Sequence, residues 1–274
     1  MAVLLHASSA FAWETIEEPQ VTPESGWWST SDRSGPTLVI EVLRPGTLYA
    51  GLLLHAADGS PTWYVVEATG TGATQTGMLQ AFVDGQTLDG AWQPSVYAGS
   101  PGAASFTFDT STSGWLEWPG GRLRIERADV ASGFGTSAPR QRGAWWFNGS
   151  ESGRGFFVEA RGGILSVLGT MYDERGRAVW YMARGPMTTP QLFQGTLTRS
   201  AAADGTAHAA TLGTLTVQFY DGSTGMITMP SGRQVPVVRY GLCLEVQRLA
   251  RMGMAASHVL PGFPWPGCGS APHE

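Results

Sequence analysis

The sequence predicts a nearly all-β protein made of two tandem, small antiparallel β-barrels of about eight strands each. Three observations lead to this fold class: an internal repeat, a succession of short apolar runs separated by turn residues, and a composition rich in glycine and tryptophan. One continuous β-sandwich built from both copies is the alternative that the same pattern allows.

The composition favours short strands joined by tight turns. The 274 residues include 37 glycines, 17 prolines and 11 tryptophans, and only 14% of them are charged. This profile argues against long helices and disorder. The formal net charge is −5, with the charges scattered singly, so nucleic acid is not expected as a partner. No apolar stretch approaches the roughly 18 residues of a membrane helix, so no membrane span is expected.

The internal repeat is the strongest evidence for two units. Rare residues return in the same order about 118 positions later. The matched positions are Trp27-Trp28 with Trp145-Trp146, Glu41 with Glu159, and Trp63-Tyr64 with Trp180-Tyr181. The repeat predicts, in order, a leader, a first barrel, a linker, a second barrel and a Pro/Gly-rich tail. Their predicted bounds are 1–24, 25–127, 128–141, 142–240 and 241–274.

Apolar runs of strand length follow one another within each copy. In the first copy they lie near 26–30, 36–43, 47–56, 62–69, 76–83, 103–109, 113–118 and 121–127. Asp58-Gly59 and residues 173–176 separate consecutive runs and are typical of hairpin turns. About eight strands in such a unit are enough for an up-and-down sheet to close on itself.

Comparison of the two copies predicts which face of each strand is buried. Leu48, Ala50, Leu52 and Leu54 match apolar or small residues in the second copy, so we expect them to point inward. Because successive side chains alternate in a strand, one ring of each Trp-Trp pair must lie outside its own barrel. The outward rings need a cover: the other barrel, a partner chain, or a flat ligand such as a sugar.

Motifs of the second copy resemble a known repeat. They are Trp145-Trp146-Phe147-Asn148, Ser152 to Glu159, Met171-Tyr172-Asp173, Gly176, Trp180-Tyr181 and Gly185-Pro186. This set resembles a tandem β-repeat found in exported proteobacterial proteins, to which no function is generally assigned. The first copy departs from it at Leu54-His55-Ala56, where the pattern has an aromatic residue before Asp. In outline the chain is also similar to avidin-like barrels, which concerns the fold alone.

Two sets of repeated residues are candidates for function. Aromatic ligand contacts are predicted from six tryptophans, with packing as the alternative: Trp27, Trp28, Trp63, Trp145, Trp146 and Trp180. Glu41 and Glu159 are the candidate catalytic carboxylates. The alternative for these two is a structural ion pair closing each barrel, with Arg127 or Arg239 on the last strand.

No cofactor or metal site is predicted. The five histidines lie far apart without ligand spacing: His6, His55, His208, His258 and His273. Gly70-Thr71-Gly72 starts like a dinucleotide loop but lacks the third glycine. The function predicted is therefore a binding or interaction module that contacts a small molecule, a glycan or a protein through aromatic side chains. An enzyme using Glu41 or Glu159, or a purely structural envelope protein, are the alternatives.

The two ends of the chain predict export and a disulfide. Ala10-Phe11-Ala12 resembles a signal-peptide cleavage site, which predicts a secreted or periplasmic protein that begins near Trp13. Cys243 and Cys268 flank a Gly/Pro-rich segment and are expected to form a disulfide in that compartment. The intact mass of periplasmically expressed protein, with and without reductant, measures both features. Two thiols that alkylate without reduction would contradict the disulfide.

Overall fold

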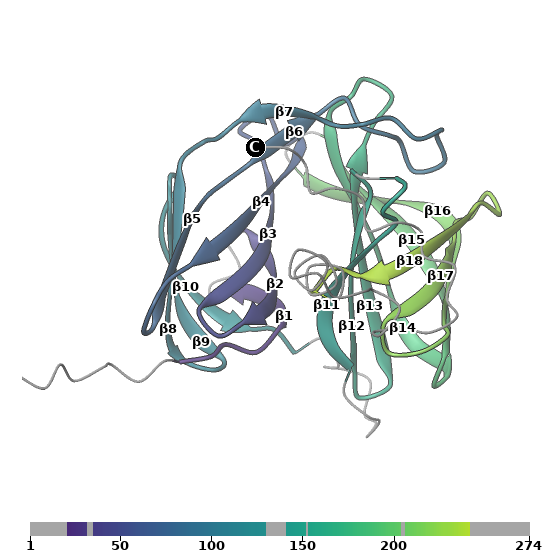
Figure 1. Cartoon of the computed structure of the whole chain (residues 1–274). Coiled ribbons are helices and arrows are strands. Elements are labelled where there is room, and N and C mark those ends of the chain that lie inside the picture. The colour runs from purple at the N-terminus through teal and green to yellow at the C-terminus, as the bar shows by residue number, and fades with distance from the viewer. Residues whose placement is uncertain (1–20, 32–34, 130–140, 152, 204–205, 242–274) are drawn as a thin grey trace, which may run out of the picture.

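Two closed antiparallel barrels and a two-stranded arm make up the computed structural model (Figure 1). The structure describes residues 21–31, 35–129, 141–151, 153–203 and 206–241. The predicted fold class is confirmed, and the continuous sandwich is excluded because each copy closes its own sheet. Cys243 and Cys268, and the cleavage site near Trp13, lie outside the described residues.

The first barrel has the strand order β1-β10-β9-β8-β5-β4-β3-β2. Its strands are β1 (Gly26–Thr30), β2 (Thr37–Arg44), β3 (Thr47–His55), β4 (Pro61–Thr69), β5 (Thr74–Met78), β8 (Ala103–Thr110), β9 (Ser113–Trp118) and β10 (Gly121–Arg127). The barrel closes where β1 pairs with β10, in a register that sets Trp28 opposite Arg127. Closure pairs both edges of the sheet, which would otherwise expose unpaired backbone groups.

The second barrel is a simple meander from β11 to β18. Its strands are β11 (Gln141–Phe147), β12 (Gly155–Arg161), β13 (Ile164–Tyr172), β14 (Ala178–Thr189), β15 (Leu192–Ala203), β16 (Thr206–Phe219), β17 (Thr224–Thr228) and β18 (Gln234–Arg239). It closes in the same way as the first, with Trp146 opposite Arg239. The two copies therefore share one topology as well as one sequence pattern.

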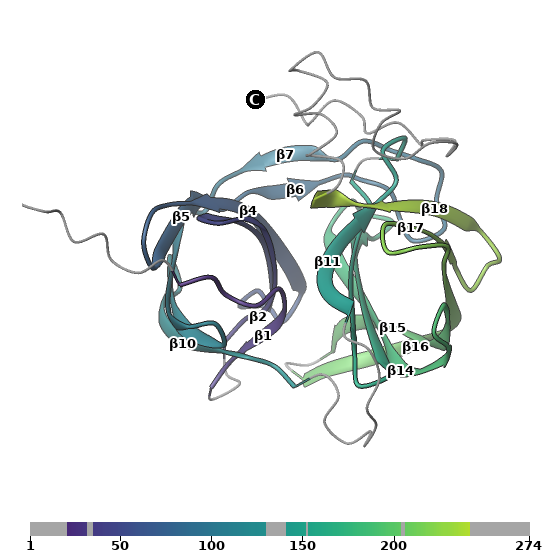
Figure 2. The same ribbon diagram turned by 60° about the horizontal axis from the view of Figure 1, so that its bottom comes forward.

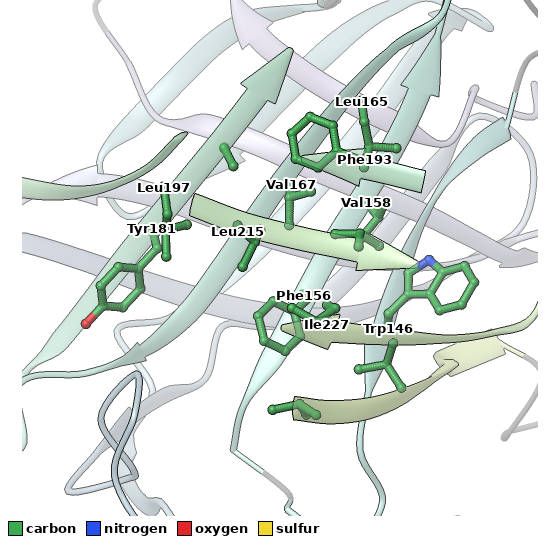
Figure 3. Packing of buried hydrophobic residues seen from close by; sticks show 14 of the residues in the cluster. Trp146, Phe156, Val158, Leu165, Val167, Tyr181, Phe193, Leu197, Leu215 and Ile227 are labelled. Atoms are coloured by element: carbon green, nitrogen blue, oxygen red, sulfur yellow. The ribbon is translucent and has the colours of Figure 1, made fainter. Parts of the chain in front are cut away.

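Each barrel has its own apolar core, as the period-two pattern predicts. Leu48, Ala50 and Leu52 are buried with Trp28 inside the first barrel, while Leu54 packs against that core and is partly buried. Figure 3 shows the equivalent core of the second barrel around Trp146. Burying aromatic and branched side chains in this way is the main source of stability for small barrels.

The expected single strand over 76–83 is wrong. The chain leaves the first barrel after β5, and the next strand, β6 (Ala81–Val83), pairs instead with β7 (Val96–Gly99). Strand β8 pairs with β5, so the barrel closes without strands β6 and β7. Residues 79–102 form an arm that extends from the first barrel to the second (Figure 2). We call this segment the arm.

Candidate functional site

The repeated tryptophan pairs divide between the barrel cores and the contact between the barrels. Trp28 and Trp146 lie inside their own barrels. Trp27 and Trp145 lie in a separate apolar cluster that both barrels contribute to. Both of these rings pack edge-on against Phe157, with ring centroids 6.2 and 5.5 Å apart. The cover that the outward rings require is therefore the other barrel.

Trp63 and Trp180 also lie at the contact between the barrels. Trp63 is only 6% exposed, packs against Tyr172 with ring centroids 5.6 Å apart, and donates its indole N–H to the Met171 carbonyl at 3.3 Å. Trp180 is half-buried and packs edge-on against His55. A ligand surface at these rings requires contact with water in the free protein, and Trp63 does not meet that condition.

The two candidate catalytic glutamates bridge the barrels. Glu41, in the first barrel, accepts the Trp145 N–H at 2.8 Å, and Glu159, in the second, accepts the Trp27 N–H at 2.8 Å. The Trp27 carbonyl accepts the Ala128 N–H just beyond the end of β10, so the Trp27 N–H on the same side has no strand partner. Each carboxylate thus satisfies a backbone donor that its partner barrel leaves unpaired.

The arginines are paired across the barrels as well. Arg127 of the first barrel lies 2.5 Å from Glu159, and Arg239 of the second lies 3.5 Å from Glu41. The structural ion pair that was the alternative to a catalytic carboxylate is therefore present, but the expectation that it closes each barrel is wrong. The last strand of each barrel pairs with the first strand rather than the second, so the arginine meets the glutamate of the other copy.

The environment of Glu41 changes its acidity. Burial raises the pKa of Glu41 from its ordinary value of 4.5 to about 7, and the Trp145 N–H and Arg239 offset only part of that shift. Such a pKa suits acid–base chemistry. The carboxylate is nevertheless 2% exposed and bound to the backbone of the other barrel, so we assign it to the interface.

Two cavities are lined in part by the residues of the two ion pairs between the barrels, Arg127–Glu159 and Arg239–Glu41. One has a volume of about 560 Å³ and is lined by Arg127, Glu159, Arg161 and Arg239, among other residues. The other, of about 280 Å³, is lined by Glu41, Arg239 and the turn after β16. Most of the charged groups in both already hold the interface together, so neither cavity offers a set of free binding groups.

A third cavity, of about 470 Å³, lies between the arm and the turn that joins β13 to β14. It is lined by residues 84–87 and 90–93 of the arm and by residues 173–176 of the turn. We call it the arm cleft. Its volume falls in the range of small-molecule sites. It is lined by the arm of the first copy, which has no counterpart in the second copy, and by a turn of the second copy.

Backbone hydrogen bonds attach the arm to the second barrel. The Asp84 N–H donates to the Gly176 carbonyl at 2.8 Å, and the Tyr172 N–H donates to the Gln86 carbonyl at 3.2 Å. Asp84 has a φ of 59°, a left-handed conformation that aspartate and asparagine adopt more readily than other non-glycine residues. A β-carbon at Gly176 would lie 2.0 Å from the Asp84 carboxylate, so only glycine leaves room for it.

A buried arginine also attaches the arm. The Arg154 guanidinium donates to the Thr87 and Gly90 carbonyls, both at 3.3 Å. Its side chain is fully buried and pairs with Glu151, which also pairs with Arg233 at 2.7 Å. Arg154, Glu151 and Arg233 are not among the functional residues predicted from the sequence. The sequence signal that could have indicated Arg154 is its difference from the first copy, which has a proline at the equivalent position.

Several side chains that line the arm cleft are exposed to solvent. The Asp173 carboxylate, in contrast, is buried and accepts hydrogen bonds from the backbone of Arg175 and from both the backbone and side chain of Arg177. Asp84 and Glu174 are exposed, and Trp92 is 48% exposed. The cleft thus combines an accessible indole ring with accessible carboxylates.

The comparisons with known proteins add no assignment. No family model, curated protein or solved structure matches this chain. Among the described residues there is no group of three or more His, Cys, Asp or Glu that could hold a metal ion. The part of the chain that the structure describes also has no helix long and apolar enough to cross a membrane.

The two glutamates should respond differently to neutralisation. Glu159→Gln leaves Arg127, whose side chain is 6% exposed, with only the more distant and more exposed Glu24 carboxylate at 3.7 Å, so we expect a loss of about 3 kcal/mol in unfolding free energy. Glu41→Gln should cost nothing or stabilise the protein at pH 8, because the raised pKa of Glu41 shows that its buried carboxylate is disfavoured there, and because Arg239 is 33% exposed and can be hydrated. Urea denaturation at pH 8 measures both, and equal losses would contradict the assignment.

The same variants test the pH dependence. The folded pKa of Glu41 lies above its ordinary value, so its stabilising contribution is complete below about pH 4.5 and is lost as the pH rises toward 7. Relative to Glu41→Gln, the wild type should therefore lose on the order of 3 kcal/mol between pH 4.5 and 8. A difference that does not change with pH would show that the carboxylate is not shifted.

Replacement of Trp63 should destabilise the protein. Trp63→Ala removes a buried ring and its hydrogen bond to Met171, so we expect a loss of about 3–5 kcal/mol. Trp92→Ala is the matched control and should cost clearly less unfolding free energy than Trp63→Ala, since Trp92 is 48% exposed. Thermal and urea unfolding measure both, and a Trp63→Ala variant as stable as the control would contradict the packing role.

Proposed function

We propose that the protein is a non-enzymatic binding protein whose ligand site is the arm cleft. The observation that carries this proposal is the half-exposed Trp92 ring at the edge of a cavity of about 470 Å³ with accessible polar side chains. A protein that exposes a large aromatic ring beside a preformed cavity retains apolar area that a ligand can cover.

The repeated residues support the proposal by elimination. Trp27, Trp145 and Trp63 are covered where the barrels meet, and Glu41 and Glu159 bind the backbone of the opposite barrel. Their recurrence in both copies is explained by the packing of two equivalent barrels. Among the residues that line the arm cleft, in contrast, are non-repeated ones, as expected when only one site of a duplicated protein binds a ligand.

A secreted or periplasmic location is part of the proposed function. An Ala10-Phe11-Ala12 cleavage site and two cysteines near the end of the chain favour a secreted or periplasmic protein. In that compartment a binding protein meets glycans and small solutes of the envelope. A purely structural role is the second candidate, and the extensive apolar contact between the barrels favours it.

A thermal-shift screen of small molecules and glycans distinguishes the two. A ligand of the cleft present at about 100 times its dissociation constant should stabilise the wild type by about 3 kcal/mol. Trp92→Ala should lose this stabilisation, and Tyr97→Ala should keep it. Tyr97 is a matched control because it is exposed on the same arm but does not line the cleft. Ligands that stabilise all three proteins equally, or no ligand at all, would favour the structural role.

A further inference from the structure

We infer that the arm cleft binds a neutral sugar, with one pyranose ring stacked on Trp92 and its hydroxyl groups held by Asp84 and Glu174. This inference rests on the proposed function and specifies its ligand class. Three properties of the cleft lead to it: the small number of aliphatic groups, the balance of charge, and the fixed course of the arm backbone that carries Asp84.

The lining of the cleft excludes an aliphatic ligand. Of the residues that surround it, Trp92 is the only one with a large apolar side chain, and Ala91 is the only aliphatic one. The others are glycine or have polar side chains. A lipid or another alkyl chain would find no apolar walls there. A flat ring with one apolar face and a polar rim, in contrast, matches one indole surrounded by polar groups.

The charges of the cleft disfavour an anionic ligand. The accessible charged groups are the carboxylates of Asp84 and Glu174 and the guanidinium of Arg175. Asp173 adds no free charge, because Arg177 lies 2.7 Å from its carboxylate. A phosphate or a sugar acid would meet two carboxylates for each arginine. Carboxylates and guanidinium groups are strong hydrogen-bonding partners for the neighbouring hydroxyl groups of a neutral sugar.

The backbone that carries Asp84 is held in place before a ligand arrives. The Asp84 backbone donates to Gly176 and accepts from the Gln93 side chain at 2.6 Å, which fixes the arm at the point where Asp84 turns. Gln93 is fixed in turn, because its N–H donates to the buried Gln86 side chain at 3.2 Å. A preformed site loses little entropy on binding, which matters for a weakly bound, hydrated ligand such as a sugar.

The test uses the full chain with nitrogen-15-labelled tryptophan. Indole N–H resonances are followed during titration with glucose, galactose, mannose, N-acetylglucosamine, maltose and cellobiose, and Trp92→Phe assigns the resonance of Trp92. At least one of these sugars should shift that resonance saturably, with a dissociation constant in roughly the millimolar to micromolar range. Trp92→Ala should weaken binding about tenfold or more, and Tyr97→Ala should not change it.

Variants of the carboxylates test the ligand class. Asp84→Asn with Glu174→Gln should weaken sugar binding about tenfold, because hydrogen bonds to charged acceptors are stronger. Asparagine tolerates the left-handed conformation of residue 84, so the arm should keep its course. Sodium chloride at 0.5 M should leave the affinity for a neutral sugar unchanged within about twofold.

Tetramethylammonium chloride and inorganic phosphate are titrated in the same way, as a cationic and an anionic alternative to the sugars. Saturable shifts of the Trp92 resonance by either ion, and by none of the six sugars, would overturn the sugar inference and leave the proposed binding site in place. If no sugar and no ion shifts that resonance, the sugar inference fails. If the thermal-shift screen also yields no ligand that depends on Trp92, the proposed function fails with it.

Discussion

The carboxylates of Glu41 and Glu159, each of which binds the backbone of the other barrel, join the two barrels into one packed unit. Each barrel begins with a strand whose first tryptophan has a backbone N–H that no neighbouring strand reaches, and the glutamate of the other copy accepts it. An unpaired buried N–H costs about 1–3 kcal/mol, so the barrels can bury these two N–H groups against each other only because the carboxylates accept them. Because the contact is reciprocal, its geometry fixes how the barrels face each other. The outward tryptophans are then covered, and the arm is directed toward the second barrel.

The arm depends on that arrangement. Its hydrogen bonds to Gly176 and Tyr172, and the contacts of Arg154 with its carbonyls, are possible only when the second barrel stands at this distance and angle. The buried Arg154 would be a costly isolated charge without Glu151 and the arm carbonyls around it. The arm in return covers one end of the contact between the barrels, where Phe82 packs against Trp63. Interface and cleft are therefore parts of one packed unit.

The period-two pattern and the repeat were enough to predict the barrels and the inward faces, because both follow from local geometry. Leu48, Ala50 and Leu52 are buried as the alternation requires. The crossing of Glu41 to Trp145 was not predictable in this way, since it depends on the relative orientation of two closed sheets, which has no periodic signal. The arm was missed for a different reason. Residues 76–83 form a continuous run of strand-compatible residues, and nothing local shows that the chain leaves the barrel after Met78.

The arm cleft occurs once in the described part of the chain because the arm is not duplicated. Contacts between two equivalent barrels occur twice when the residues on both sides are repeated. The hydrogen bonds of Glu41 to Trp145 and of Glu159 to Trp27 are such a pair. The arm is an insertion in the first copy only, and Asp173 of the receiving turn is matched by an alanine in the first copy. The cleft thus needs one feature from each copy. A ligand held there would contact the arm and the second barrel at once, so binding would also strengthen the attachment of the arm to that barrel.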